Sequence, residues 1–165
     1  FNAPNFLKSP EPLIQKEFAR IMSLKDGLKK MSKSDPSDFS RINLSDDKDL
    51  IINKIKKSKT DTLSMPGQND DLEKRPEVLN LLGIYSILSN QNLDKVKSEF
   101  EGKNFSSFKD NLSELLVGKI EPIGKKIKDL LKDEKYLDKI LEKGREKADN
   151  LASKKITKMK TLVGF

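Results

Sequence analysis

The chain has 165 residues, which is enough for one domain or two small ones. It carries 33 Lys and Arg against 26 Asp and Glu, for a net charge of +7, and 36% of its residues are charged. Because Cys and His are both absent, the composition excludes disulfides, zinc fingers, thiolate nucleophiles and imidazole bases, and leaves chemistry to Lys, Arg, carboxylates, hydroxyls and backbone N–H groups.

The N-terminal third of the sequence predicts little regular structure. Residues 1–12 hold three prolines and no hydrophobic period, so we expect an irregular arm. The apolar run at 19–24 ends before an Asp-Gly pair at 26–27, which predicts a buried strand, although a helical turn has the same pattern. The polar stretch 25–38 is predicted to be a loop, and it contains four lysines: Lys25, Lys29, Lys30 and Lys33.

About five helices are expected after this loop. Ser45 is the predicted N-cap of the first helix, with acidic residues 46–47 in its opening turn. Basic residues at the other end complement the helix dipole, and they are Lys54, Lys56, Lys57 and Lys59. Three apolar side chains form the predicted buried side: Leu50, Ile51 and Ile55.

Four further helices follow a long loop at 60–74. Pro76 suits the first position of one that runs to Leu88, and a short helix at 93–101 lies between a capping Asn and a terminating Gly. A longer helix begins near Phe105, and Pro122 should kink or end it. Apolar residues at spacings of three and four predict the last helix, which Gly164 closes: Leu137, Ile140, Leu141, Ala148, Leu151, Ala152, Ile156, Met159 and Val163. Tyr85, Phe105 and Phe108 occupy apolar helix positions, where core packing is favoured over base stacking.

The lysine-rich loop is the segment best suited to chemistry. Its centre reads Lys30-Met31-Ser32-Lys33-Ser34, which places two ammonium groups three residues apart with hydroxyls beside them. Such a loop can close over a polyanion and neutralise the negative charge of a transferred phosphate. For an arbitrary lysine cluster, a solvated surface loop is the commoner structure.

That pentapeptide is identical to the KMSKS signature of class I aminoacyl-tRNA synthetases, and it lies between a predicted strand and a switch to helices. Other segments narrow the resemblance to the tryptophanyl-tRNA synthetase family of bacterial and organellar type. They are residues 19–24, 35–36, 42–47, 54–56, 60–61, 80–86, 101–103 and 108–109. A sister-family ligase for another amino acid is the nearest competitor within the enzymes.

The resemblance implies an ATP-dependent, cytoplasmic tryptophan–tRNA ligase that forms tryptophanyl adenylate and transfers the amino acid to tRNA(Trp). By position, Lys30 and Lys33 would neutralise the triphosphate as pyrophosphate leaves. Met31, Ser32 and Ser34 would shape the loop and contact ATP. Ile21 and Met22 match a strand edge whose backbone contacts adenine. Mg²⁺ would accompany ATP without a protein-bound metal site, the full enzyme would be a homodimer, and no membrane is involved.

The implied fold is mainly α. Residues 1–44 would form the C-terminal edge of a Rossmann-like nucleotide-binding domain with the KMSKS loop, and residues 45–165 a helical bundle that binds the anticodon. Class I enzymes also carry a His-x-Gly-His signature, which a chain without histidine lacks. We therefore expect a C-terminal part that does not activate tryptophan alone.

Two hypotheses from other classes stay open. Basic residues crowd the last two helices and attract nucleic acid phosphates, so a free-standing helical RNA-binding module without catalysis is the main alternative. These residues are Lys125, Lys126, Lys128, Lys143, Arg145, Lys147, Lys154, Lys155, Lys158 and Lys160. A coiled-coil partner protein is disfavoured because the heptad spacing does not extend beyond the final helix and because Gly102 and Pro122 interrupt the preceding pattern.

Overall fold

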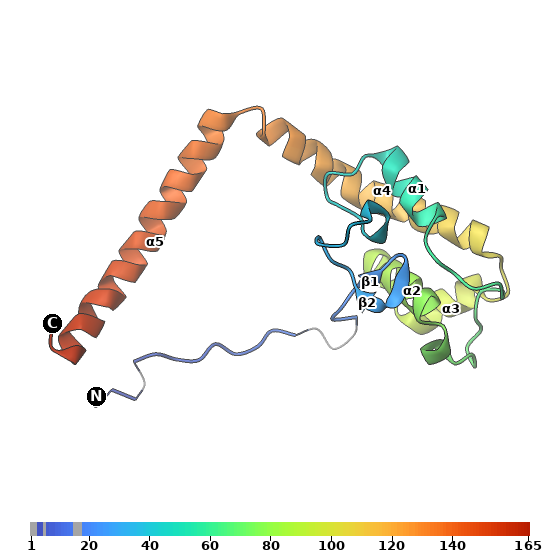
Figure 1. Cartoon of the computed structure of the whole chain (residues 1–165), viewed down its shortest axis with the longest axis horizontal. Coiled ribbons are helices and arrows are strands. Elements are labelled where there is room, and N and C mark those ends of the chain that lie inside the picture. Colours follow the sequence, from blue (N-terminus) through green and yellow to red (C-terminus); the bar gives the residue numbers. More distant parts are fainter. Residues whose placement is uncertain (1–2, 5, 15–17) are drawn as a thin grey trace. The chain divides into compact units, whose positions relative to one another are not determined.

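The computed structural model describes residues 3–4, 6–14 and 18–165, in which a two-stranded sheet precedes five α-helices (Figure 1). The chain forms two compact units, one comprising Gln15–Ile127 and the other residues 1–14 with Lys128–Phe165. The larger unit holds β1 (Met22–Ser23), β2 (Asp26–Lys30), α1 (Lys48–Lys56), α2 (Pro76–Ser89), α3 (Leu93–Phe100) and most of α4 (Phe105–Leu130), with single helical turns at Asp38–Ser40 and Leu72–Lys74. The mainly helical class predicted from the sequence is confirmed. The division at residue 44 stays a prediction.

The core of the larger unit forms around three aromatic rings. Tyr85, Phe100 and Phe108 lie with ring centroids 4.9 to 5.8 Å apart, and two of the three contacts are edge-to-face. Phe105 packs against this core from its edge. The predicted core placement of Tyr85, Phe105 and Phe108 is therefore confirmed. The remaining buried apolar residues come from the hairpin, four helices and one loop: Leu24, Ile51, Ile55, Met65, Val78, Leu81, Leu82, Ile84, Val96, Leu112 and Leu116.

The predicted loop at 25–38 is wrong in its first part, because Asp26–Lys30 is the second strand of a hairpin. The chain reverses at residues 24–25 rather than at the Asp-Gly pair. Gly27 lies within β2 against the start of α2, where a Cβ would come within 2.5 Å of the backbone of Pro76 and Glu77. The glycine therefore allows close approach of strand and helix instead of making the turn.

The start of α1 also differs from the prediction. Asp47, and not Ser45, is the N-cap, since its Oδ1 accepts the N–H of Leu50 at 2.9 Å. Ile51 and Ile55 are buried as predicted. Lys54 was expected to be one of the basic residues that complement the dipole of α1, but it is not solvated. Its side chain is buried and ion-paired with Asp38 and Asp46, since burying an ammonium group without any partner would be costly.

α4 runs through Pro122, so the proline does not end the helix, and a kink at this position stays a prediction. The proline removes a single N–H from a helix of 26 residues. Ahead of it, the buried side chains of Phe108, Leu112 and Leu116 fix α4 in the core. Lys109 adds a polar link, since its Nζ donates to the carbonyl oxygens of Lys56 and Ser58 at the end of α1.

In the second unit, α5 (Glu134–Val163) confirms the predicted last helix. Asp133 accepts the N–H of Tyr136 at the N-terminus, and Gly164 adopts a left-handed conformation at the end. None of its side chains is buried among the described residues, and Leu141 and Leu151 are each about two-thirds exposed. Across the ranges that the structure describes, no helix is both long enough and apolar enough to traverse a bilayer.

Candidate functional site

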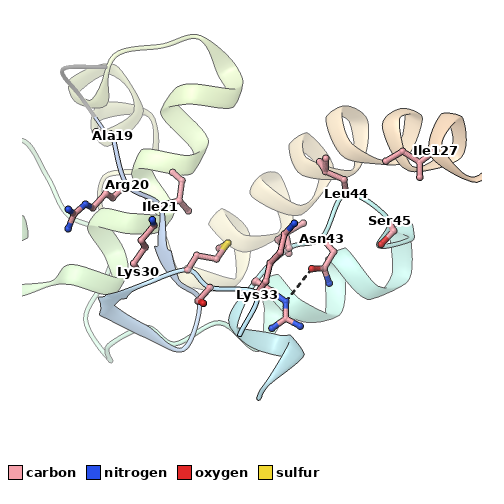
Figure 2. A pocket seen from close by; sticks show the side chains of 13 residues that line it. Ala19, Arg20, Ile21, Lys30, Lys33, Asn43, Leu44, Ser45 and Ile127 are labelled. Carbon is pink, nitrogen blue, oxygen red and sulfur yellow. Dashed lines mark hydrogen bonds between the residues drawn. The ribbon is translucent and has the colours of Figure 1, made fainter. Parts of the chain in front are cut away.

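A pocket of about 650 Å³ in the larger unit lies beside the KMSKS loop (Figure 2). It is lined by the chain entering β1, the end of β2, the loop itself, the segment before α1, and α4. The lining residues are Ala19, Arg20, Ile21, Lys30, Met31, Ser32, Lys33, Arg41, Ile42, Asn43, Leu44, Ser45 and Ile127. Five of the seven site residues predicted from the sequence are among them. Met22 and Ser34 are not.

The hairpin places the start of the loop. Met22 pairs with Lys30 across the two strands, and the N–H of Met31 donates to the carbonyl oxygen of Ile21 at 3.0 Å. Lys30 is therefore the last residue of β2, and the loop leaves the sheet directly after it. Because the turn between the strands is only two residues long, the first lysine of the signature is held by a short, well-defined element.

The tip of the loop is a tight turn built around Ser32. The N–H of Ser34 donates to Ser32 Oγ at 3.2 Å, and the N–H of Asp35 approaches Ser32 O at 3.4 Å. Lys33 lies at the centre of this turn with an exposed side chain. Figure 2 shows Arg20 and Lys30 at the hairpin end of the pocket and Lys33 nearer to Asn43.

The pocket is electropositive. Four of its lining residues are cationic and none is Asp or Glu. Among the described residues, the ammonium groups of Lys30 and Lys33 take part in no ion pair, whereas the guanidinium of Arg41 lies 3.0 Å from Asp38. Unpaired cations beside hydroxyl and amide groups can attract a polyanion and stabilise negative charge that develops on it.

The strand edge predicted to contact adenine is hydrogen-bonded to another part of this chain. The side chain of Asn80 on α2 accepts the N–H of Met22 at 2.8 Å and donates to its carbonyl oxygen at 2.9 Å. The carbonyl oxygen of Ile21 accepts from Met31. These bonds fix the strand edge against α2, and an adenine contact by Ile21 and Met22 stays a prediction.

Arg41 anchors the other end of the loop. Its NH1 donates to the carbonyl oxygen of Asp35 at 3.0 Å, its Nε donates to Asn43 Oδ1 at 3.2 Å, and its NH2 pairs with Asp38. One fork of donors therefore ties the loop backbone to the segment before α1. The side-chain hydrogen bond from Lys54 is the main reason that the pKa of Asp38 lies below its ordinary value, so this carboxylate stays ionised.

Sequence reasoning missed three residues of this pocket and its support: Arg41, Asn43 and Asn80. Arg41 and Asn43 line the pocket. Asn80 lies 58 positions after its partner Met22. No local pattern marks such pairs, although the segments 42–47 and 80–86, which carry Asn43 and Asn80, contributed to the family resemblance. Arg20 was visible in the segment before the hairpin, but only the fold brings it to the same pocket as Lys30.

Comparisons with known proteins agree with the signature. The profile of the family described as "tRNA synthetases class I (W and Y)" matches residues 1–119. A tryptophan–tRNA ligase of Rickettsia felis is 52% identical over 159 residues, which are 96% of this chain and 48% of the relative. One from Caulobacter vibrioides is 47% identical over all 165 residues, again 48% of the relative. The chain spans about half the length of these curated relatives.

Solved structures show the same fold. A tryptophanyl-tRNA synthetase from Mycoplasma pneumoniae aligns with a TM-score of 0.77 and 24% identity, covering 92% of this chain and 45% of that one. One from Campylobacter jejuni, complexed with ADP and tryptophan, aligns with a TM-score of 0.67 and 22% identity, over 99% and 49%. With the KMSKS loop on the rim of a cationic pocket and the family profile matched over most of the sequence, the chain belongs to the class I tRNA synthetases of the tryptophan and tyrosine family.

Proposed function

We propose that the chain is the C-terminal part of a tryptophan–tRNA ligase and that its loop binds the triphosphate of ATP. One observation carries this proposal: Lys30 and Lys33 of the signature, both without carboxylate partners among the described residues, line one cationic pocket with Arg20. The names of the relatives support tryptophan as the amino acid and tRNA(Trp) as the acceptor.

In the proposed reaction, a carboxylate oxygen of tryptophan attacks the α-phosphorus of ATP, and the bond from that phosphorus to the departing pyrophosphate breaks. Negative charge grows on the leaving group, where Lys30 and Lys33 stabilise it as point charges. Ser32 and Ser34 add hydroxyl donors, and Met31 packs against the hydrophobic core at the start of the loop. Mg²⁺ would enter with ATP and neutralise phosphate charge, held by phosphates and water rather than by this chain.

The test is the affinity of the 165-residue chain for MgATP, measured by titration calorimetry. Lys30→Ala with Lys33→Ala should weaken binding about 10- to 30-fold, since each lost point charge costs on the order of 1 kcal/mol. Lys25→Ala with Lys29→Ala is the matched control. It removes the same amount of charge from nearby positions, but neither lysine lines the pocket, so the loss should stay below about threefold. Equal losses of MgATP affinity in the two double variants would show that only the net charge of the chain matters, and would contradict the proposal.

A second part of the proposal concerns catalysis by the isolated chain. The chain has no histidine and covers 48% of its first relatives, so we propose that it does not activate tryptophan alone. Tryptophan-dependent exchange of pyrophosphate into ATP should be absent with the purified 165-residue chain. Exchange above the no-enzyme rate, abolished by Lys33→Ala, would overturn this part.

The helical region is proposed to contact tRNA(Trp), and the complete enzyme to be a homodimer. On α5, Lys143, Lys147, Lys154 and Lys158 recur at intervals of four, seven and four, which places them on one side of the helix. Changing all four to Gln should weaken tRNA binding and flatten its dependence on salt. The alternative, an RNA-binding module without catalysis, predicts the same tRNA result but no protection of the KMSKS loop from protease by MgATP. Protection that is lost with Lys30→Ala and Lys33→Ala would exclude that alternative.

A further inference from the structure

A buried ion cluster lies between α1 and the KMSKS loop. The side chain of Lys54 is fully buried, and its Nζ lies 2.6 Å from Oδ2 of Asp46 and 2.6 Å from Oδ2 of Asp38. Asp46 is buried too, with 4% of its side chain exposed, whereas Asp38 is 46% exposed. Lys54 therefore has one partner that satisfies it inside the core and a second that faces outward, toward the loop.

Charges alternate outward from this second partner. Asp38 Oδ1 lies 3.0 Å from Arg41 NH2, and Arg41 NH1 donates to the carbonyl oxygen of Asp35, also at 3.0 Å. Asn43 joins the cluster, because its Nδ2 donates to Asp38 at 3.0 Å and to Asp46 at 3.1 Å. A series of short polar contacts thus leads from a fixed ammonium group in the core to the backbone two residues after Lys33.

We propose that Asp38 is a positioning residue: by joining Lys54 to Arg41, it holds the C-terminal end of the KMSKS loop where the loop meets a triphosphate. The inference rests on the proposed ATP-binding function. Asp38 itself makes no contact with ligand in this proposal. It acts through Arg41 on Asp35, and so on the placement of Lys33.

Charge repulsion alone predicts the opposite change in ligand affinity when the Asp38 carboxylate is removed. A carboxylate near a polyanion site repels the ligand, so its removal should tighten binding if Asp38 had no other role. The positioning role requires weaker binding, because an unrestrained loop must be ordered when the ligand binds and that ordering subtracts from the affinity. The sign of the change separates the two views without any assumption about magnitude.

Two substitutions and one control provide the test on the 165-residue chain. Asp38→Asn keeps the side-chain shape but turns an NH₂ group toward Lys54 or Arg41. Arg41→Lys keeps the charge but loses the fork that reaches Asp35 and Asn43 together. Asp47→Asn removes a neighbouring carboxylate and preserves the N-cap of α1, since Asn caps as well as Asp.

Titration with MgATP should give an affinity about 3- to 10-fold lower for Asp38→Asn and for Arg41→Lys, a change typical of losing one restraint on a binding loop. Asp47→Asn should bind as the wild type does, or slightly more tightly. Unchanged or tighter binding by Asp38→Asn, in a chain whose wild type binds MgATP, would overturn the inference and leave the proposed function standing. The urea midpoint of each variant shows whether a loss of affinity follows from unfolding.

Amide hydrogen exchange measured without nucleotide tests the positioning role of Asp38 independently of the proposed ATP binding. The amides of Ser34 and Asp35 are bonded within the loop turn, so their exchange should accelerate at least about threefold in Asp38→Asn and Arg41→Lys, but not in Asp47→Asn. If the wild-type chain does not bind MgATP, the proposed function fails while this readout still decides the positioning role. Exchange equal to wild type in both variants would overturn it.

Discussion

Gly124 of α4 faces the carbonyl oxygen of Leu44 so closely that a Cβ at this position would lie 2.8 Å from it. The segment that approaches the glycine lines the cationic pocket and leads into Asp46 of the buried ion cluster. One missing methyl group on α4 therefore decides how closely the pocket wall packs.

Gly124→Ala should destabilise the protein by about 1–3 kcal/mol, because the new Cβ meets backbone that cannot rotate away. Gly118→Ala is the matched control in the same helix. Its Cβ would meet nothing within 4 Å, so the higher helix propensity of Ala should stabilise the protein by about 0.5–1 kcal/mol. Urea unfolding followed by circular dichroism measures both changes. Stabilisation by both substitutions would contradict the close approach at Gly124.

Removing the ammonium group of Lys54 should cost much more. Lys54→Met leaves the buried carboxylate of Asp46 without its cation, and we expect a loss of about 3–5 kcal/mol in the free energy of unfolding. Lys56→Met, two residues further along α1 but about 60% exposed and 3.9 Å from Asp110, should change stability by less than about 0.5 kcal/mol. Thermal melts of the two variants compare the buried and exposed lysines directly. Similar melting temperatures would contradict the burial of Lys54.

Asn80 should be essential for attaching the hairpin to α2. Asn80→Leu has similar volume but leaves both backbone groups of Met22 unpaired, for an expected cost of about 2–4 kcal/mol. Asn111→Leu changes an exposed amide whose side-chain hydrogen bond, within the described part of the chain, goes to Ser107 of the same helix, and it should cost less than about 1 kcal/mol. Hydrogen exchange of the β1 and β2 amides should rise in the first variant alone.

The free energy of unfolding should fall in acid, because protonation breaks two partly exposed ion pairs. Asp61 accepts two bonds from Arg75, at 2.7 and 2.8 Å, and these bonds lower the pKa of Asp61. The bond from Lys59 likewise lowers the pKa of Glu77. The folded chain therefore binds protons more weakly than the unfolded chain at these carboxylates. Their contribution is complete above their ordinary values of 3.8 and 4.5 and is lost as the pH falls through the lower folded values.

The urea midpoint should accordingly be flat from pH 7 to about 5 and decline below about pH 4.5. Asp61→Asn should lower the midpoint at pH 7 and make the decline in acid shallower, because it removes one of the groups whose pKa differs between the two states. An acid decline as steep in Asp61→Asn as in the wild type would contradict a role for this pair.

The local part of this fold could be predicted from the sequence. Hydrophobic spacing together with capping signals located the five helices, and Asn92 and Gly164 were correctly expected as a helix cap and a helix stop. The KMSKS pentapeptide could be read directly from the sequence. Two predictions about single residues were wrong. Gly27 resembled a turn residue, yet it lies in a strand where α2 leaves no room for a Cβ. Ser45 resembled an N-cap, yet Asp47 takes that place.

The sequence by itself determined the basic, mainly helical character of the chain and the KMSKS loop with its two lysines, because helix periodicity, capping and a continuous motif depend on residues only a few positions apart. Only the tertiary structure decided that Lys54 is buried between Asp38 and Asp46, that Asn80 holds Met22, and that Arg41 ties down the loop. Those contacts depend on which charge or amide the folded chain places opposite each group. A lysine near a helix end has the same sequence pattern whether it is solvated or buried.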